Sequence, residues 1–178
     1  YKQHIHDGKV TCHTLDHDTT AAARMGHAEG VRQLVPAQIR ISDPETEFCE
    51  VEGVGLPFNL PNRLSLREGP EAIDAQRLGR ACQAVQDALC LGIPAIPGGD
   101  PVLRVFSAWP GEWDAAFRLA APLGFTVSAA MMKGNVDFVE IRSDKGQPCT
   151  IHNPWSDGKV QLIRNGCPAE VLSDELLQ

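Results

Sequence analysis

The second half of the chain alternates between apolar and polar positions with a period of two, which is typical of half-buried β-strands. The alternation recurs three times, with its apolar positions at Phe125, Val127, Ala129, Val139, Ile141, Val160 and Leu162. Turn signals that contain glycine separate these runs at residues 133–135, 144–146, 157–158 and 165–166. Short strands at this spacing predict an antiparallel β-sandwich over residues 99–178.

The first half of the chain predicts helices instead. The clearest helix covers residues 70–91, because Pro70 occupies the favoured first helical position and Gly92 with Pro94 supplies the stop. Its apolar residues recur at helical spacing and form one stripe, which consists of Leu78, Cys82, Val85 and Leu89. Such a stripe needs a partner surface, so we expect either the rest of the chain or a second copy in a homo-oligomer to cover it.

Three further segments carry weaker signals. A second helix is predicted over residues 18–34, closed by Pro36 and weakened by Gly26 and Gly30. Residues 48–54 fit a short strand, and residues 92–101 (GIPAIPGGDP) fit a linker or a turn-rich crossover. The predicted fold class is therefore α+β. A mainly helical and irregular segment, residues 1–98, precedes the antiparallel β-sandwich domain, residues 99–178.

The net charge and the length of the apolar runs argue against two classes of partner. The net charge is −7 and neither half of the chain is basic, so binding to a phosphate backbone lacks its driving force and no nucleic-acid partner is expected. No apolar run reaches 18 residues, so no membrane partner is expected either. The start at Tyr1, without Met or a signal-peptide pattern, fits a processed protein, a truncated chain or an incomplete reading frame, and it indicates no compartment.

The six cysteines form no CxxC pair and no tight framework. We expect reduced and mostly buried thiols. The alternative is a disulfide between Cys149 and Cys167, because both lie on predicted strands and could meet across a sheet. Glycine-rich phosphate-binding loops are absent as well, so no cofactor is expected.

The chain has three tryptophans, Trp109, Trp113 and Trp155, and the first and last of them lie beside prolines at predicted strand ends. A large aromatic residue at such a place commonly fills the end of a sandwich core, and this is the first interpretation. An exposed indole can also stack on the apolar face of a sugar ring. The same three residues are therefore the candidate sugar-stacking residues.

Five of the six histidines lie near the N-terminus, and four of them are candidate metal ligands: His4, His6, His13 and His17. His4 and His6 would lie on one face of a strand, and His13 and His17 on one face of a helix. The two pairs need different local structures at once, and HExxH is absent. Solvated or locally hydrogen-bonded histidines are the favoured interpretation, so no metal is expected.

Paired carboxylates are the usual catalytic groups of glycoside hydrolases. The sequence offers an acidic segment with Glu45, Glu47, Glu50 and Glu52, and a second group with Asp100, Glu112 and Asp114. Glu50, Glu52, Glu112 and Asp114 are the candidate catalytic residues. Each is also the kind of acid found on any protein surface, because geometry alone decides which carboxylates form a catalytic pair.

Residues 103–155 read LRVFSAWPGEWDAAFRLAAPLGFTVSAAMMKGNVDFVEIRSDKGQPCTIHNPW. This segment resembles the C-terminal region of bacterial glycoside hydrolases of family 95, the α-L-fucosidase and α-L-galactosidase group. That family keeps a similar AWP…W pattern, and its β domain follows a helical catalytic barrel. Residues 70–91 resemble the last barrel helix, whereas GIPAIPGGDP replaces the family's usual turn. The catalytic acid and base of the family lie on earlier barrel helices, so neither is carried over to this chain.

The resemblance implies a carbohydrate-active protein. The leading hypothesis is an accessory or truncated module with little catalysis of its own, whose partners are carbohydrate and a catalytic domain missing from this chain. The alternative is a small free-standing glycoside hydrolase that uses paired carboxylates. A second alternative is a metal-binding module that uses the N-terminal histidines.

Overall fold

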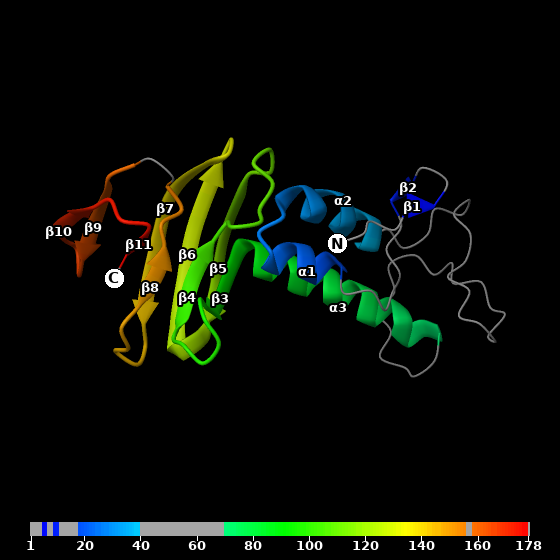
Figure 1. Ribbon diagram of the computed structural model, residues 1–178, viewed down its shortest axis with the longest axis horizontal. Helices are drawn as coiled ribbons and strands as arrows, with labels where there is room; N and C mark the ends of the chain where they lie inside the picture. Colours follow the sequence, from blue (N-terminus) through cyan, green and yellow to red (C-terminus); the bar gives the residue numbers. More distant parts are fainter. Residues whose placement is uncertain (1–4, 7–8, 11–17, 40–69, 156–157, 178) are drawn as a thin grey trace. The chain divides into compact units, whose positions relative to one another are not determined.

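The computed structural model describes residues 5–6, 9–10, 18–39, 70–155 and 158–177 (Figure 1). The chain is α+β, with an N-terminal helical segment followed by a largely antiparallel β-sandwich, as the sequence predicts. It divides into two compact units, Tyr1–Asp87 and Ala88–Gln178. The division therefore lies before the boundary at residue 98 that the sequence indicates.

The first unit contains two short helices where the sequence predicts one. Helix α1 spans Asp18–Arg24 and helix α2 spans Ala28–Ile39. Gly26 separates them in the left-handed conformation, with φ of 72°. The amide of His27 donates to Ala22 and that of Gly26 donates to Ala23, at 2.9 and 3.2 Å. This is a Schellman cap, so Gly26 ends α1 instead of merely weakening a longer helix.

Helix α2 begins and continues in ways that the sequence did not predict. The Nδ1 atom of His27 accepts the backbone N–H of Gly30 at 2.8 Å, so this histidine caps the start of the helix. Pro36 lies inside α2 and does not close it. The hydroxyl of Thr19 in α1 donates to the Oε1 atom of Gln38 at 2.5 Å, which ties the two helices together.

Helix α3 spans Pro70–Leu89 and starts where the sequence predicts. Its buried apolar positions are Ala81, Ala84 and Ala88, whereas Cys82 is exposed. The predicted stripe is thus wrong at Cys82, because the small alanines form the closely packed face. Val85 and Leu89 are half-buried, and the side chain of Leu78 lies outside the described residues.

One buried carboxylate joins α1 to α3 within this unit. Asp87 accepts the Nε–H of Arg24 at 2.8 Å and the side-chain amide of Gln83 at 2.7 Å. A separate two-stranded hairpin precedes the helices and pairs β1 (Ile5–His6) with β2 (Lys9–Val10). Residues 48–54, for which a strand is predicted, lie outside the described residues.

The second unit begins with a hairpin where the sequence suggests a linker or crossover. Strand β3 (Cys90–Pro94) pairs antiparallel with β4 (Pro101–Val105), so GIPAIPGGDP supplies strand β3 and the hairpin loop. The prediction of a linker is wrong here because the pairing partner, not the local composition, makes residues 90–94 a strand. Pro94 pairs with Pro101, at the position where the hairpin opens.

Two sheets form the sandwich (Figure 1). The three-stranded sheet has the order β5-β6-β7 and is antiparallel throughout. The four-stranded sheet has the order β11-β8-β4-β3, and its β4–β8 pair is parallel. A separate hairpin pairs β9 with β10. The bounds are β5 Ala115–Ala121, β6 Phe125–Met132, β7 Asn135–Ser143, β8 Thr150–His152, β9 Val160–Arg164, β10 Cys167–Leu172 and β11 Leu176–Leu177.

The core lies between the inner faces of the two sheets. One cluster of buried residues takes alternate positions from both sheets, together with Phe106 from the loop after β4: Leu103, Val105, Phe125, Val127, Ala129, Met131, Ile151 and Leu177. The alternation predicted for 125–129 is therefore confirmed. Gly92 lies on the inner face of β3, where an added Cβ would lie 2.6 Å from the Cδ atom of Pro122.

Two predicted turns are two-residue hairpin loops. Lys133 and Gly134 join β6 to β7, and Asn165 and Gly166 join β9 to β10. All four residues have positive φ, between 50° and 79°. Positive φ at both central residues is the type I′ arrangement, whose twist suits antiparallel strands and so fixes the register of both hairpins.

Candidate functional site

Two of the three candidate tryptophans lie in the loop that joins β4 to β5, residues 106–114. The indole N–H of Trp109 donates to the backbone carbonyl of Trp113 at 2.8 Å. The two rings meet edge to face, with their centroids 5.4 Å apart and their planes at 72°. This contact and this hydrogen bond hold both rings in fixed orientations.

The third tryptophan follows β8 and reaches the other sheet. The indole N–H of Trp155 donates to the carbonyl of Val136 at 2.7 Å, at the beginning of β7. Its backbone N–H donates to the Oδ1 atom of Asn153 at 2.9 Å, which shapes the Asn153-Pro154 turn. Trp155 therefore occupies a point on the outer edge of the three-stranded sheet.

The β6–β7 turn brings these residues to one end of the sandwich. Asp114 accepts the backbone N–H of Lys133 at 2.7 Å, and a Cβ added to Gly134 would lie 3.4 Å from the carbonyl of Gly111. The 106–114 loop thus lies against the turn, while Trp155 contacts the strand that leaves it. We call this group of Trp109, Trp113 and Trp155 the tryptophan end.

The three indoles differ in their relation to the core. Trp109 packs against the core cluster, as the first sequence interpretation expects. Trp113 and Trp155 are half-buried, but in the described part of the chain they are not among the residues packed against that cluster. In the described structure, their rings therefore lie outside the core cluster.

Only two of the four candidate catalytic carboxylates, Glu112 and Asp114, lie in the described part of the chain. Glu50 and Glu52, like Glu45 and Glu47, lie outside the described residues. Glu112, Asp114 and Asp100 are exposed. The carboxylate of Asp114 caps the β6–β7 turn through Lys133, which is a structural role.

The candidate histidine ligands gain no support from the described structure. His4, His13 and His17 lie outside it, and only the backbone of His6, in β1, is described. Among the residues that are described, no group of three His, Cys, Asp or Glu side chains could hold a metal ion. Over the same residues, no helix is long and apolar enough to cross a membrane.

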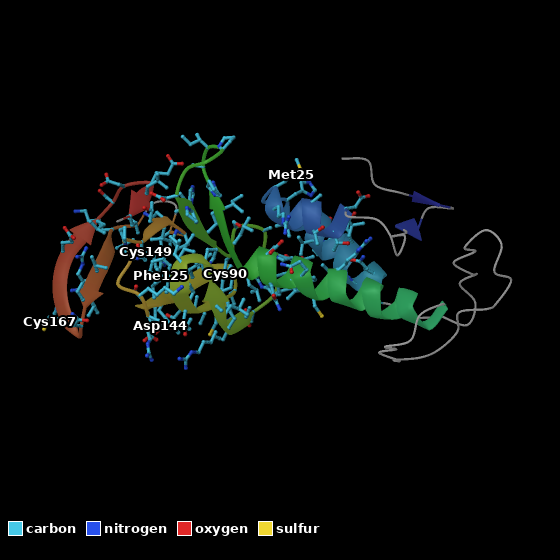
Figure 2. All side chains as sticks on the ribbon, turned by 90° about the horizontal axis from the view of Figure 1, so that it is seen from below. Met25, Cys90, Phe125, Asp144, Cys149 and Cys167 are labelled. Carbon is cyan, nitrogen blue, oxygen red and sulfur yellow. The ribbon has the colours of Figure 1, made fainter. Side chains whose placement is uncertain are left out.

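The described cysteines are free thiols, and Cys149 makes no disulfide with Cys167 (Figure 2). Cys82 and Cys167 are exposed, which corrects the expectation of mostly buried thiols. Burial raises the pKa of Cys90 to about 11, and the nearby Cys149 contributes to the rise. Burial also raises the pKa of Cys149. Since the thiolate is the reactive form, neither thiol is suited to act as a nucleophile near neutral pH.

Sequence reasoning identified the tryptophans but missed the groups that hold them, such as Asn153 and the carbonyl of Val136. The Asn153-Pro154 dipeptide is a turn signal that could have located the first of these. Comparison of the chain with protein-family models, with curated proteins and with solved structures finds no match.

Proposed function

We propose that this chain is a non-catalytic accessory module of a carbohydrate-active protein, and that it binds sugar rings weakly at the tryptophan end. The observation that carries the proposal is the position of Trp113 and Trp155, which are half-buried outside the core cluster. The resemblance of residues 103–155 to the C-terminal region of family 95 glycoside hydrolases supports the same assignment. That segment includes the whole tryptophan end.

The proposal assigns catalysis to another domain. Of the four candidate carboxylates, Asp114 already caps a turn, and the exposed Glu112 lies in the same loop. A catalytic pair needs two carboxyl groups about 5–10 Å apart across a cleft. A helical barrel that carries such a pair would be the natural working partner, and the adjoining genomic sequence would reveal it.

Binding is tested by titrating the chain with fucose, galactose and their oligosaccharides while tryptophan fluorescence and amide NMR shifts are followed. We expect weak saturable binding that moves the signals of Trp113 and Trp155. Trp113→Ala and Trp155→Ala should each weaken it by about twofold to tenfold, the range of one aromatic contact. Phe138→Ala is the matched control, because Phe138 is also an exposed aromatic residue but is not one of the candidate sugar-stacking residues.

A separate assay tests the absence of catalysis. The purified chain should not hydrolyse aryl-fucosides, aryl-galactosides or aryl-glucosides. Hydrolysis that survives repurification and is lost in Glu112→Gln or Asp114→Asn would contradict the non-catalytic assignment and favour the free-standing hydrolase.

A further inference from the structure

The outer face of the four-stranded sheet carries an arginine in the middle of a cross-strand row. Leu91 of β3 pairs with Arg104 of β4, and Leu176 of β11 pairs with His152 of β8. Leu103 pairs with Ile151, so the next step of the parallel register sets Arg104 beside His152. The alternate residues of these strands belong to the core, so this row points away from it.

Burial falls from one end of this row to the other. Leu91 is 5% exposed, whereas the side chain of His152 is 44% exposed and Leu176 is 45% exposed. Arg104, between Leu91 and His152, is half-buried. Arg104 therefore lies in the row between the buried Leu91 and the more exposed His152.

One nitrogen of the Arg104 guanidinium lacks an acceptor. Its Nη1 atom is buried and has no hydrogen-bond partner in the part of the chain that the structure describes. Arginine keeps its charge at physiological pH, so it cannot relieve this by losing a proton. A buried charged donor without a partner is unfavourable, and a bound oxyanion is one group that removes the penalty.

Two further donors lie on the adjacent strand. His152 is on β8 beside Arg104, and Thr150 is on the same face two residues earlier, where it pairs with Val102. The Nε2 atom of His152 is 3.5 Å from the Oε1 atom of Glu175, a contact that a ligand can replace because the Glu175 side chain is 84% exposed. Arginine, imidazole and hydroxyl side chains thus lie on the same face of the neighbouring strands β4 and β8.

We propose that Arg104 and His152 bind the carboxylate group of a small-molecule ligand. The planar guanidinium matches a carboxylate with two parallel hydrogen bonds. The row offers one permanent positive charge, next to Glu175 and in a chain of net charge −7, so one negative charge suits it better than the two of a phosphate. This inference stands apart from sugar binding at the tryptophan end.

Sodium acetate at constant ionic strength is the simplest probe, with the ring signals of His152 followed by NMR. We expect a saturable shift in the full chain. Arg104→Gln should weaken acetate binding by about tenfold or more, as expected for losing charge-assisted hydrogen bonds. Arg118→Gln, which removes an exposed arginine from the outer face of the other sheet, is the matched control and should leave the affinity unchanged.

A second variant moves the affinity in the opposite direction. Glu175→Gln removes the competing carboxylate beside His152, so acetate should bind more tightly. Because this side chain is exposed, the variant tests the site even if Arg104→Gln fails to fold. No saturable shift in the unmodified chain, or equal losses in Arg104→Gln and Arg118→Gln, would overturn the proposal.

The ligand series separates this site from the proposed sugar site. Acetate and glucuronate should both lose affinity in Arg104→Gln, and phosphate should bind no better than acetate. Glucose and fucose, which lack the carboxylate, should be insensitive to that variant. Tighter binding of phosphate than of acetate would overturn the choice of a carboxylate. Failure of the neutral sugars to bind would count only against the tryptophan end.

Discussion

At the scale of single residues, Gly92 shows how closely the two sheets approach. Its inner-face position on β3 leaves no room for a side chain, since an added Cβ would meet the Cδ and Cγ atoms of Pro122 at 2.6 and 2.8 Å. The proline ring belongs to the turn between β5 and β6, so it cannot move without displacing both strands. Local sequence signals identified Gly92 only as a helix stop, because this contact spans 30 residues of chain.

Gly92→Ala should therefore lower the free energy of unfolding by about 1–3 kcal/mol, the usual cost of overpacking. Gly79→Ala is its control, because Gly79 lies in α3 with no atom within 4 Å of the added Cβ. That variant should raise the stability by up to about 1 kcal/mol through helix propensity. Urea unfolding of both proteins measures the difference, and equal effects would contradict the steric explanation.

The thiol of Cys90 makes stability depend on alkaline pH. Its pKa is raised from 9.0 to about 11, first by burial and then by Cys149. The folded protein therefore holds this proton more tightly than the unfolded chain does. The resulting stabilisation is complete below pH 9 and is lost as the pH rises toward 11.

Unfolding curves at pH 8, 9 and 10 should accordingly show a smaller loss of stability in Cys90→Ala than in the unmodified protein. Cys167→Ala, at an exposed position, should keep the full loss. Parallel pH profiles for Cys90→Ala and the unmodified chain would show that this thiol does not contribute.

At the scale of elements, the sequence predicted what depends on near neighbours and missed what depends on distant ones. The β6 alternation and the turns at Lys133-Gly134 and Asn165-Gly166 are local, and each is confirmed. Strand β3 was missed because only its pairing with β4 distinguishes it from a Pro- and Gly-rich linker. For the candidate site, the pattern located the tryptophans, but their relation to the core follows from contacts such as that of Trp155 with Val136, 19 residues away.

The ion pair between α1 and α3 should contribute more to the stability of the fold than a surface ion pair does. Arg24→Gln removes a 2.8 Å contact to Asp87, which is only 6% exposed and would still accept the side-chain amide of Gln83. The expected loss is about 1–3 kcal/mol, at the lower end because the Arg24 side chain is itself 58% exposed.

Arg32→Gln provides the comparison, because Arg32 pairs with Glu29 on the exposed surface of α2. Such a pair contributes little, so thermal unfolding should be nearly unchanged. A loss in Arg32→Gln as large as that in Arg24→Gln would mean that burial of Asp87 is not what makes its pair important.

At the scale of the whole molecule, the two compact units differ in how they are built. The helical unit combines buried apolar residues such as Val31 and Leu34 with buried polar contacts, Thr19 with Gln38 and Arg24 with Asp87. The sandwich has an apolar cluster drawn entirely from residues after Ala88. The backbone carbonyl of Leu89, at the end of α3, accepts the amide of Phe106 at 2.9 Å within this second unit.

Residues 88–178 alone should therefore fold. We expect a cooperative urea transition and dispersed amide NMR signals from this shortened chain. A companion beginning at residue 99, the boundary that the sequence suggests, lacks β3 and should be markedly less stable. Equal stability of the two would show that β3 is dispensable.

Strand β8 has only three residues, yet it lies between β4 and β11 and arrives late in the chain. During synthesis, β5, β6 and β7 emerge consecutively, and each can pair with the strand before it as a hairpin. The β3–β4 hairpin leaves the ribosome earlier still, but the core that it shares with the other sheet stays incomplete until residues 150–177 deliver Ile151 and Leu177. In that interval the nascent chain exposes apolar surface, to which a chaperone would bind.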